Sequence, residues 1–208
     1  MKQMPFRTMG RAMALGLCLF ACASCGTAVR QGRGSSYLVI DALLAASGAE
    51  PDKLSNSLSS DVQTIVKVDD VPTPVIYEDR AQAVVRVSMK DPTSTTQPST
   101  TNEITLTGYH VTFKRADGRN APGVDVPYAF DGAVTATAKV GSTVTVQFVL
   151  VRVQAKIEPP LVAMINGGGA IFISTIAEVT LYGHDQAGNQ VNVTGAINVN
   201  FGNWADPQ

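Results

Sequence analysis

Two histidines, His110 and His184, are the only imidazole groups that the 208-residue chain offers for catalysis. Nucleophilic catalysis needs a base beside a nucleophile, and usually a carboxylate that orients the base. The chain contains no G-x-S-x-G motif, which would present a serine at a strand-to-helix turn. His110 falls on the polar side of an alternating segment, and His184 directly precedes an expected turn at Asp185. We therefore interpret both histidines as surface or turn residues and predict no catalytic residues.

Two pairs of adjacent acids, Asp69–Asp70 and Glu78–Asp79, suggest a second chemistry. Two carboxylates can hydrolyse a glycosidic bond. Neighbouring side chains on a strand point to opposite faces, so we favour solvated loop charges over a catalytic pair. A glycan-binding or carboxylate-dependent glycan-cleaving envelope protein is the alternative function. The aromatic content of 6% and the single Trp204 argue modestly against a sugar-binding face.

Calcium is a further candidate ligand, because it binds oxygen atoms that are often contributed by several loops. The residues near expected turns that could supply such oxygens are Asp117, Asp125, Asp131, Asp185 and Asn189. No D-x-[DN]-x-[DN]-G loop fixes their spacing. We therefore predict no metal ligands and no cofactor, and leave open whether the loops bind a calcium ion.

Residues 113–128 bring cations and acids close together in a segment that is expected to contain a turn. Its charged residues are Lys114, Arg115, Asp117, Arg119 and Asp125. One interpretation is a polar recognition loop with an aromatic edge at Tyr128. We favour a hairpin tip with internal ion pairs, each of which contributes about 0–1 kcal/mol when exposed.

The overall composition excludes several classes of protein. The chain is 45% hydrophobic and 16% charged, compared with roughly 25% charged residues in an average globular domain, and it contains 18 Gly and 11 Pro. This excludes a disordered polyelectrolyte, a coiled coil and a collagen-like fibre. Sixteen basic and seventeen acidic residues argue against nucleic-acid binding, which needs a basic surface. The length predicts one domain.

Residues 1–21 are predicted to form a signal peptide. Their only charged residues are Lys2, Arg7 and Arg11, and residues 12–23 are an apolar run. This run is too short to span a bilayer, which needs about 20 residues. A basic start, a short apolar run and small residues after it are typical of export signals.

The segment L-F-A-C (Leu19–Cys22), followed by A-S-C-G, resembles the lipobox of bacterial lipoproteins. That box has an apolar residue three positions before a cysteine and a small residue directly before it. Cys22 fits with Leu19 and Ala21, and Cys25 fits less well. The resemblance implies acyl chains on Cys22, or alternatively on Cys25. Ordinary secretion with cleavage near Ala23 is the other interpretation.

The rest of the chain differs in kind from this segment. All three cysteines lie in or beside it, so no disulfide can form within the body. Cleavage before Cys22 removes three cations and changes the net charge from −1 to −4, which leaves no polybasic membrane patch. Residues 22–36 are expected to form the lipidated cysteine and a flexible tether, since residues 26–36 contain three Gly and two Ser.

Alternation of apolar and polar residues dominates the predicted body, residues 37–205. Along one face lie Ala81, Ala83, Val85 and Val87, with Gln82 and Arg86 between them. The expected strands are residues 37–43, 62–68, 81–90, 104–113, 133–140, 142–157, 171–183 and 190–201. Residues 37–46 also fit a helix, and residues 190–201 also fit a pair of strands broken near Gly195. The parity of the 104–113 strand changes at Gly108, which predicts a β-bulge. These patterns predict a single antiparallel β-sandwich of about seven to nine strands.

Two segments between the strands carry further information. Residues 91–103 contain no apolar residue except two prolines, so we expect a mobile solvated Ser/Thr/Pro loop. A domain linker is the alternative, but neither flank alone shows a closed set of strands. Residues 177–191 contain D-x-A-G-N at 185–189 and resemble the penultimate hairpin of bacterial immunoglobulin-like modules. That resemblance implies an immunoglobulin-like sandwich and gives no ligand.

Together these observations predict a lipid-anchored cell-envelope protein that is a non-catalytic binding, adhesion or assembly module. N-terminal acyl chains are expected to hold it to a membrane, and an envelope protein is its expected partner. No Asp follows Cys22 or Cys25. By analogy with enteric lipoproteins, this favours the outer membrane, with the protein facing the periplasm or the surface.

Overall fold

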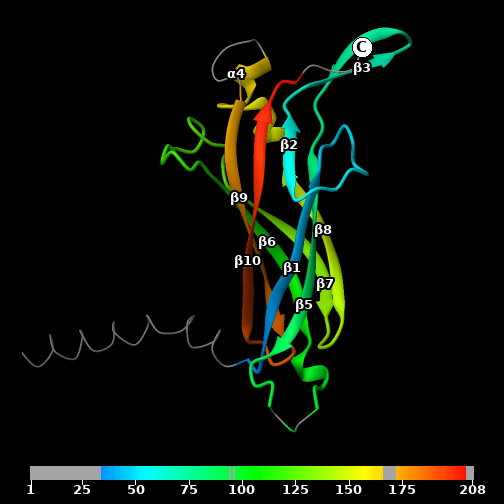
Figure 1. Ribbon diagram of the computed structural model, residues 1–208, viewed down its shortest axis with the longest axis vertical. Helices are drawn as coiled ribbons and strands as arrows, with labels where there is room; N and C mark the ends of the chain where they lie inside the picture. Colours follow the sequence, from blue (N-terminus) through cyan, green and yellow to red (C-terminus); the bar gives the residue numbers. More distant parts are fainter. Residues whose placement is uncertain (1–33, 94, 96, 166–171, 205–208) are drawn as a thin grey trace, which may run out of the picture.

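The protein is an all-β sandwich in which two mainly antiparallel sheets pack on each other (Figure 1). The computed structural model describes residues 34–93, 95, 97–165 and 172–204. The first sheet, in spatial order, contains β1 (Ser36–Ala46), β5 (Asp79–Met89) and β8 (Thr143–Val151). The second contains β2 (Ser57–Asp61), β10 (Gln190–Gly202), β9 (Phe172–Asp185), β6 (Ile104–Lys114) and β7 (Phe130–Ala138). Only the pairing of β2 with β10 is parallel among the described strands.

The remaining elements are short. Strands β3 (Thr64–Val68) and β4 (Val71–Val75) form a separate two-stranded hairpin. Helices α3 (Val153–Ile157) and α4 (Val162–Ile165) follow β8, and a 3₁₀ turn, η1 (Thr100–Asn102), precedes β6. The described residues contain ten strands, slightly more than the sequence predicted.

The core forms where the alternating strands face each other, as predicted. Ala81, Ala83, Val85 and Val87 of β5 are all buried. In β9 the buried apolar residues Ile173, Ala177, Val179 and Leu181 likewise share one parity. Two aromatic pairs fill the space between the sheets: Tyr109 with Phe148, and Phe113 with Phe201. One face of each sheet is thus dry and the other wet, as period-two alternation requires.

The predicted bulge is confirmed. Against β9, Leu106 and Gly108 pair with the consecutive residues Gly183 and Tyr182, which leaves Thr107 as the extra residue. Against β7 the register shifts at the same place, but there β7 has the extra residue, because Leu106 pairs with Ala136 and Gly108 with Ala133. Gly108 is needed there because the Tyr182 ring lies over it, and a Cβ would come within 2.5 Å of that ring.

Three predicted boundaries were wrong. Residues 142–157 are not one strand: β8 ends at Val151, and the change of parity marks the start of α3. The strand predicted at residues 62–68 is β3 alone, and the flanking β2 and β4 were missed. Asp117–Gly118 is not a two-residue hairpin turn, because the whole of residues 115–129 connects β6 to β7.

One end of the sandwich, called the proximal end, receives the chain before β1. Ser36 Oγ donates to the backbone oxygen of Asn102 at 3.0 Å, and Asn102 Nδ2 donates to Ser35 Oγ at 2.6 Å. The 91–103 loop therefore lies beside the start of β1, and its last residues are packed against the body. The predicted signal peptide, Cys22, Cys25 and most of the predicted tether lie outside the described residues.

The β9–β10 turn also lies at the proximal end and confirms the turn chemistry of D-x-A-G-N. Asp185 Oδ1 accepts hydrogen bonds from the backbone N–H groups of Ala187 (2.9 Å) and Asn189 (2.8 Å). Gly188 has φ +81°, the left-handed conformation that glycine adopts without strain. The relation to immunoglobulin-like modules stays a prediction, since this turn chemistry is local.

A candidate docking surface at the distal end

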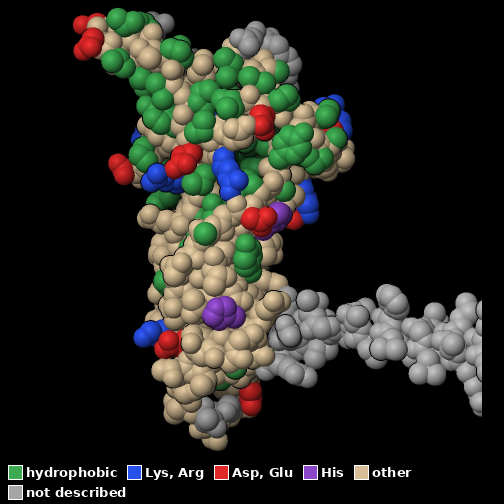
Figure 2. Space-filling view, turned by 180° about the vertical axis from the view of Figure 1, so that it is seen from behind, with side chains coloured by type: hydrophobic (Ala, Val, Ile, Leu, Met, Phe, Trp, Pro, Cys, Tyr) green, Lys and Arg blue, Asp and Glu red, His purple; other side chains and the backbone are tan. Residues whose placement is uncertain are grey.

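The opposite end, called the distal end, exposes a cluster of large apolar side chains. The β3–β4 hairpin projects from this end in Figure 1, and apolar side chains cover it in Figure 2. The cluster, called the distal surface, consists of Ile65, Val68, Val71, Phe172 and Trp204. Each of these residues is between 41% and 60% exposed. Isolated exposed apolar residues are ordinary, but a cluster of them marks an interaction site.

The hairpin has a tight turn and one blocked edge. Asp69 and Asp70 form its tip with φ of 51° and 64°, the paired left-handed conformation of a type I′ turn. Pro72 and Pro74 lie in β4 opposite Lys67 and Ile65. In a hairpin closed by a two-residue turn, the backbone groups of these two positions point away from β3. The prolines therefore remove hydrogen-bond donors only from the outer edge of β4. The hydrogen bonds between β3 and β4 therefore stay intact. A partner would contact the side chains of the hairpin and not the outer edge of β4.

Asp61 joins the hairpin to the rest of the distal surface. Its Oδ1 accepts from the Trp204 backbone N–H at 3.2 Å, and its Oδ2 accepts from Thr64 Oγ1 at 3.2 Å. The Trp204 ring packs over Gly202, where a Cβ would lie 2.7 Å from the ring. Phe172 pairs with Gly202 across β9 and β10. Asp61 thus ties Trp204 to the base of the hairpin, Phe172 lies beside Gly202 on the neighbouring strand, and Val68 and Val71 lie at the hairpin tip.

A buried ion pair lies beneath this base. Lys156 Nζ is 2.9 Å from Asp79 Oδ2, and the two side chains are 1% and 0% exposed. Lys156 also donates to the backbone oxygen of Asp61 at 2.7 Å, and Ser60 Oγ donates to Asp79 Oδ2 at 2.5 Å. The second carboxylate oxygen of Asp79 accepts from the Gly48 backbone N–H at 2.8 Å. We call Ser60, Asp61, Asp79 and Lys156 the buried clamp.

The buried clamp holds both ends of the hairpin segment. Ser60 and Asp61 precede residues 62–78, and Asp79 follows them. Burial raises the pKa of Asp79 above its ordinary value, while Lys156, Ser60 and the Gly48 amide act in the opposite direction. The clamp thus ties the residues on both sides of the hairpin segment to Lys156 of α3.

This network corrects one prediction made from the acids. Asp79 is a buried structural residue and not a solvated loop charge. Glu78 does pair with Arg80 at the surface, and Asp69 and Asp70 lie exposed at the hairpin tip. Asp79 is occupied by Lys156, so it is not available as one of two catalytic carboxylates. The sequence analysis missed Lys156, in the segment V-R-V-Q-A-K-I (residues 151–157), as a partner for Asp79.

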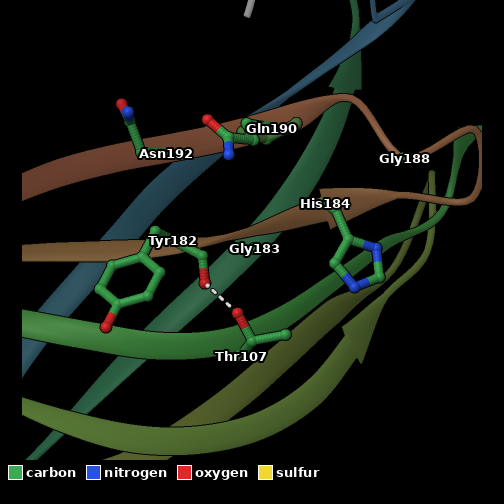
Figure 3. Close-up of a pocket in the computed structure, with 8 residues that line it drawn as sticks. Thr107, Tyr182, Gly183, His184, Gly188, Gln190 and Asn192 are labelled. Carbon is green, nitrogen blue, oxygen red and sulfur yellow. Dashed lines mark hydrogen bonds between the residues drawn. The ribbon is translucent and has the colours of Figure 1, made fainter. Parts of the chain in front are cut away.

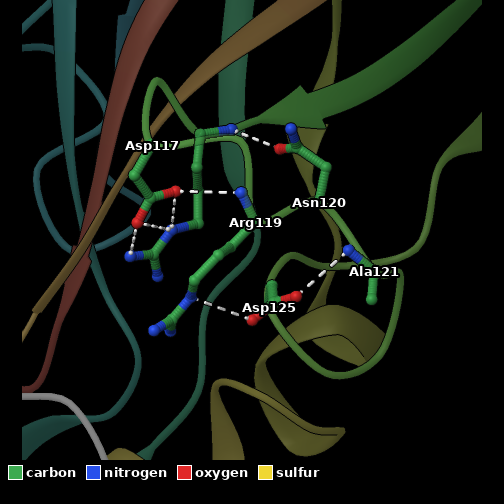
Figure 4. A network of polar contacts seen from close by, with 6 residues as sticks. Asp117, Arg119, Asn120, Ala121 and Asp125 are labelled. Carbon is green, nitrogen blue, oxygen red and sulfur yellow. Dashed lines mark hydrogen bonds and ion pairs between the residues drawn. The ribbon is translucent and has the colours of Figure 1, made fainter.

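The charged loop after β6 forms internal ion pairs, in agreement with the favoured interpretation (Figure 4). Arg115 binds Asp117 through two guanidinium nitrogens, and the Arg119 backbone N–H donates to Asp117 Oδ1 at 3.1 Å. Arg119 Nε lies 3.3 Å from Asp125 Oδ1. Lys114 instead binds Glu178 of β9 at 2.6 Å. The charges are thus used to hold the loop, and Tyr128 at its end is exposed.

The Arg115–Asp117 pair predicts a measurable titration. The Arg115 guanidinium lowers the pKa of Asp117 from 3.8 to about 2. Because the folded-state pKa is the lower one, the stabilisation is present above about pH 4 and is lost as the pH falls towards 2. We expect Arg115→Gln to return the pKa of Asp117 towards 3.8, as measured by NMR titration of the side-chain carboxyl.

Arg119→Gln is the matched control for that titration. It removes a nearby cation but keeps the backbone N–H that binds Asp117. The pKa of Asp117 should therefore move much less than in Arg115→Gln. Equal shifts in the two variants would show that net loop charge, and not the direct pair, determines this pKa.

The candidate calcium ligands are not brought together. Asp117 and Asp125 bind arginines, and Asp131 Oδ1 lies 3.0 Å from His110 Nδ1. Asp185 and Asn189 form the turn at the proximal end, away from that loop. Within residues 34–93, 95, 97–165 and 172–204, no three or more His, Cys, Asp or Glu side chains are placed to hold a metal ion.

Both histidines lie at the surface or beside a turn, as predicted. His184 lines an open cavity of about 520 Å³ on the outer face of the second sheet, with Thr107, Tyr182 and Asn192 (Figure 3). His184 Nδ1 is 3.1 Å from the Asp185 backbone oxygen. No carboxylate lines this cavity, and the hydrogen bond drawn in it joins Thr107 Oγ1 to the Tyr182 backbone oxygen. The cavity therefore lacks the orienting acid of a nucleophilic site.

No protein-family model matches the chain, and no curated protein matches it. Among the residues that the structure describes, no helix is both long enough and apolar enough to cross a membrane.

Proposed function

We propose that this protein is a lipid-anchored cell-envelope protein that binds a partner protein through its distal surface and catalyses no reaction. The observation that carries the proposal is the position of the exposed apolar side chains. They gather at the end of the sandwich opposite the start of β1. A chain held by acyl groups on Cys22 or Cys25 would present that end away from the membrane.

The chemistry of the distal surface favours a protein partner. Its apolar residues are flanked at the hairpin tip by Asp69 and Asp70, and an anionic tip is disfavoured at a membrane that carries negative charge. The buried clamp holds both ends of the hairpin segment, so less conformational freedom is lost when a partner binds than for a loop without such anchors. Non-catalytic binding also agrees with the way the acids and histidines are used within the fold.

Site-specific photo-crosslinking in the producing cells tests the proposal. A photoreactive amino acid at Val71, on the distal hairpin, is expected to give a cross-linked species of one defined mass. The same amino acid at Tyr37 is the control, because Tyr37 is similarly exposed (44%) but lies at the proximal end. Cross-linking to the same species from both positions, or from neither, would contradict a distal docking surface.

Val68→Asp sharpens this test. Val68 is 51% exposed, so the change should alter the free energy of unfolding by no more than about 0.5 kcal/mol. It places a charge within the distal surface, and we expect it to reduce the Val71 cross-link at least tenfold. A cross-link of undiminished yield in this variant would show that the apolar side chains do not mediate the contact.

A further inference from the structure

A second feature of the fold is an incomplete strand position beside β10. Strand β2 has five residues and β10 has thirteen, and their parallel pairing covers only Asn198–Gly202. Residues 190–197 of β10 pair with β9 on one side, and no described strand pairs with them on the other. We call this side of residues 190–197 the open edge.

The open edge carries backbone hydrogen-bonding groups. On the side that faces β2, the Gly202 backbone oxygen accepts from the Val62 N–H at 2.8 Å. Backbone groups of an antiparallel strand alternate in direction, so those of Ala196, Thr194 and Asn192 face the same side as those of Gly202. An added strand would find a donor and an acceptor at each of these residues.

An apolar groove lies below the open edge. It has a volume of about 450 Å³ and is lined by residues 38–43 of β1 and 193–196 of β10. Ile40 and Leu43 pack against the core and yet stay half-buried. By contrast, Ala45 pairs with Ser55, just before β2, and is only 1% exposed. Strand β2 begins only at Ser57, opposite Asn198, so it does not run beside residues 190–197, and Ile40 and Leu43 stay uncovered.

The open edge also lacks the features by which other edges of this protein are protected. The outer edge of β4 carries Pro72 and Pro74, and β1 carries a bulge beside Asp41, which is paired with Arg86. Residues 190–197 contain neither a proline nor a charged residue. Proteins commonly use proline, charge or bulges to prevent strand addition, and strand addition to unprotected edges is a known mode of peptide binding.

We propose that the open edge binds an extended segment of a partner polypeptide, which pairs with residues 190–197 in line with β2. The partner segment has apolar residues at alternate positions, because one face of it would cover Ile40 and Leu43. It carries no net charge, because the open edge offers none to pair with. Main-chain hydrogen bonds give such a contact its affinity, and the groove gives it register. This site is separate from the distal surface and does not depend on it.

Hydrogen exchange on the mature chain tests the proposal. The probe is a segment of about eight alternating valine and threonine residues, fused to a soluble carrier protein. The control is the same carrier with the valines grouped in one block. The alternating probe is expected to slow exchange of the Asn192, Thr194 and Ala196 amides at least tenfold, and the block probe is not. The absence of any slowing with the alternating probe would overturn the proposal.

Two substitutions at one residue separate edge pairing from side-chain effects. Thr194→Pro removes the outward N–H and is expected to abolish protection by the probe. Both changes remove the Thr194 hydroxyl, which contacts the Thr180 hydroxyl. Thr194→Val keeps the backbone N–H, however, and is expected to bind the alternating probe normally. If Thr194→Pro does not fold, Ala196→Pro blocks the same edge. Undiminished protection in a folded proline variant would overturn the proposal.

The free protein supplies the remaining outcomes. Slow exchange of these three amides without any probe, at every protein concentration, would show that residues 22–33 of the same chain cover the edge. Slow exchange that increases with protein concentration would show that a second copy covers it. Either result would overturn the assignment to a partner polypeptide, and fast exchange in the dilute free protein supports it.

Discussion

Lys156→Met is expected to lower the free energy of unfolding by about 3–5 kcal/mol, because it leaves the Asp79 carboxylate buried without its counter-charge. Asp79 is 0% exposed, and its other partners are a hydroxyl and an amide. These two hydrogen bonds do not replace a positive charge at 2.9 Å. Urea denaturation measured by circular dichroism gives the difference between the variant and the wild-type protein.

The pH dependence of this variant follows from the pKa of Asp79. Burial raises that pKa above its ordinary value in the folded protein, and removing Lys156 removes a cause that lowers it. The folded state then binds a proton more readily than the unfolded state, so stability falls as the pH rises through the raised pKa. We therefore expect the loss in Lys156→Met to be larger at neutral pH than at about pH 4.

Two further variants complete the test. Lys156→Met combined with Asp79→Asn removes both charges and should cost less than the sum of the single changes, since neither charge is left unpaired. Lys139→Met is the matched control, because Lys139 is 66% exposed and lies 3.8 Å from Glu103. It should change the free energy of unfolding by no more than about 0.5 kcal/mol. A loss below about 1 kcal/mol in Lys156→Met would contradict a stabilising role for the buried clamp.

Replacing both Cys22 and Cys25 with alanine is expected to abolish palmitate incorporation and to move the protein from the membrane fraction to the soluble fraction. The physical reason is that cleavage before Cys22 would leave a chain with a net charge of −4 and no polybasic patch, so the acyl chains alone would provide attachment. Metabolic labelling followed by fractionation measures both effects. The single variants identify the modified residue, and we expect Cys22→Ala alone to remove the label.

Cys18→Ala is the control for this experiment. Cys18 lies inside the apolar run, within the part of the chain that cleavage before Cys22 would remove. Labelling should therefore be unchanged in this variant. Label retained in the Cys22, Cys25 double variant would contradict the lipid anchor, and ordinary secretion would then explain the leader.

The strands could be predicted from the sequence because each sheet has one dry face. Alternation in β5, β9 and β10 depends only on neighbouring residues, and so does the change of parity at the β6 bulge. The alternation rule failed after Val151, where the chain forms α3. Lys156 of that helix pairs with Asp79, which is distant in the sequence. Both a β-bulge and the start of a helix can shift the apolar residues between odd and even positions. The alternation pattern alone therefore did not distinguish a bulge from a helix start.

The candidate sites were less accessible to sequence reasoning. The distal surface depends on which apolar residues of β3, β4 and the C-terminal segment stay uncovered, and that is decided by how the strands are ordered. The open edge depends on the difference in length between β2 and β10, and β2 was missed because S-L-S-S-D has a single large apolar residue. The ion pairs of the 115–129 loop were predictable, since their partners are close in sequence.

The arrangement of β1 has a mechanical consequence. The chain enters β1 at the proximal end, and β1 pairs with β5 from Ser36 to Ala46 along the long direction of the sandwich. A pull between an N-terminal anchor and a partner at the distal end would act parallel to these strands, while their hydrogen bonds lie across it. Tension would therefore load the whole β1–β5 ladder in shear at once, and would not open it one bond at a time. If the proposed anchor and the proposed partner hold the two ends, such a geometry would keep the protein folded while they are drawn apart.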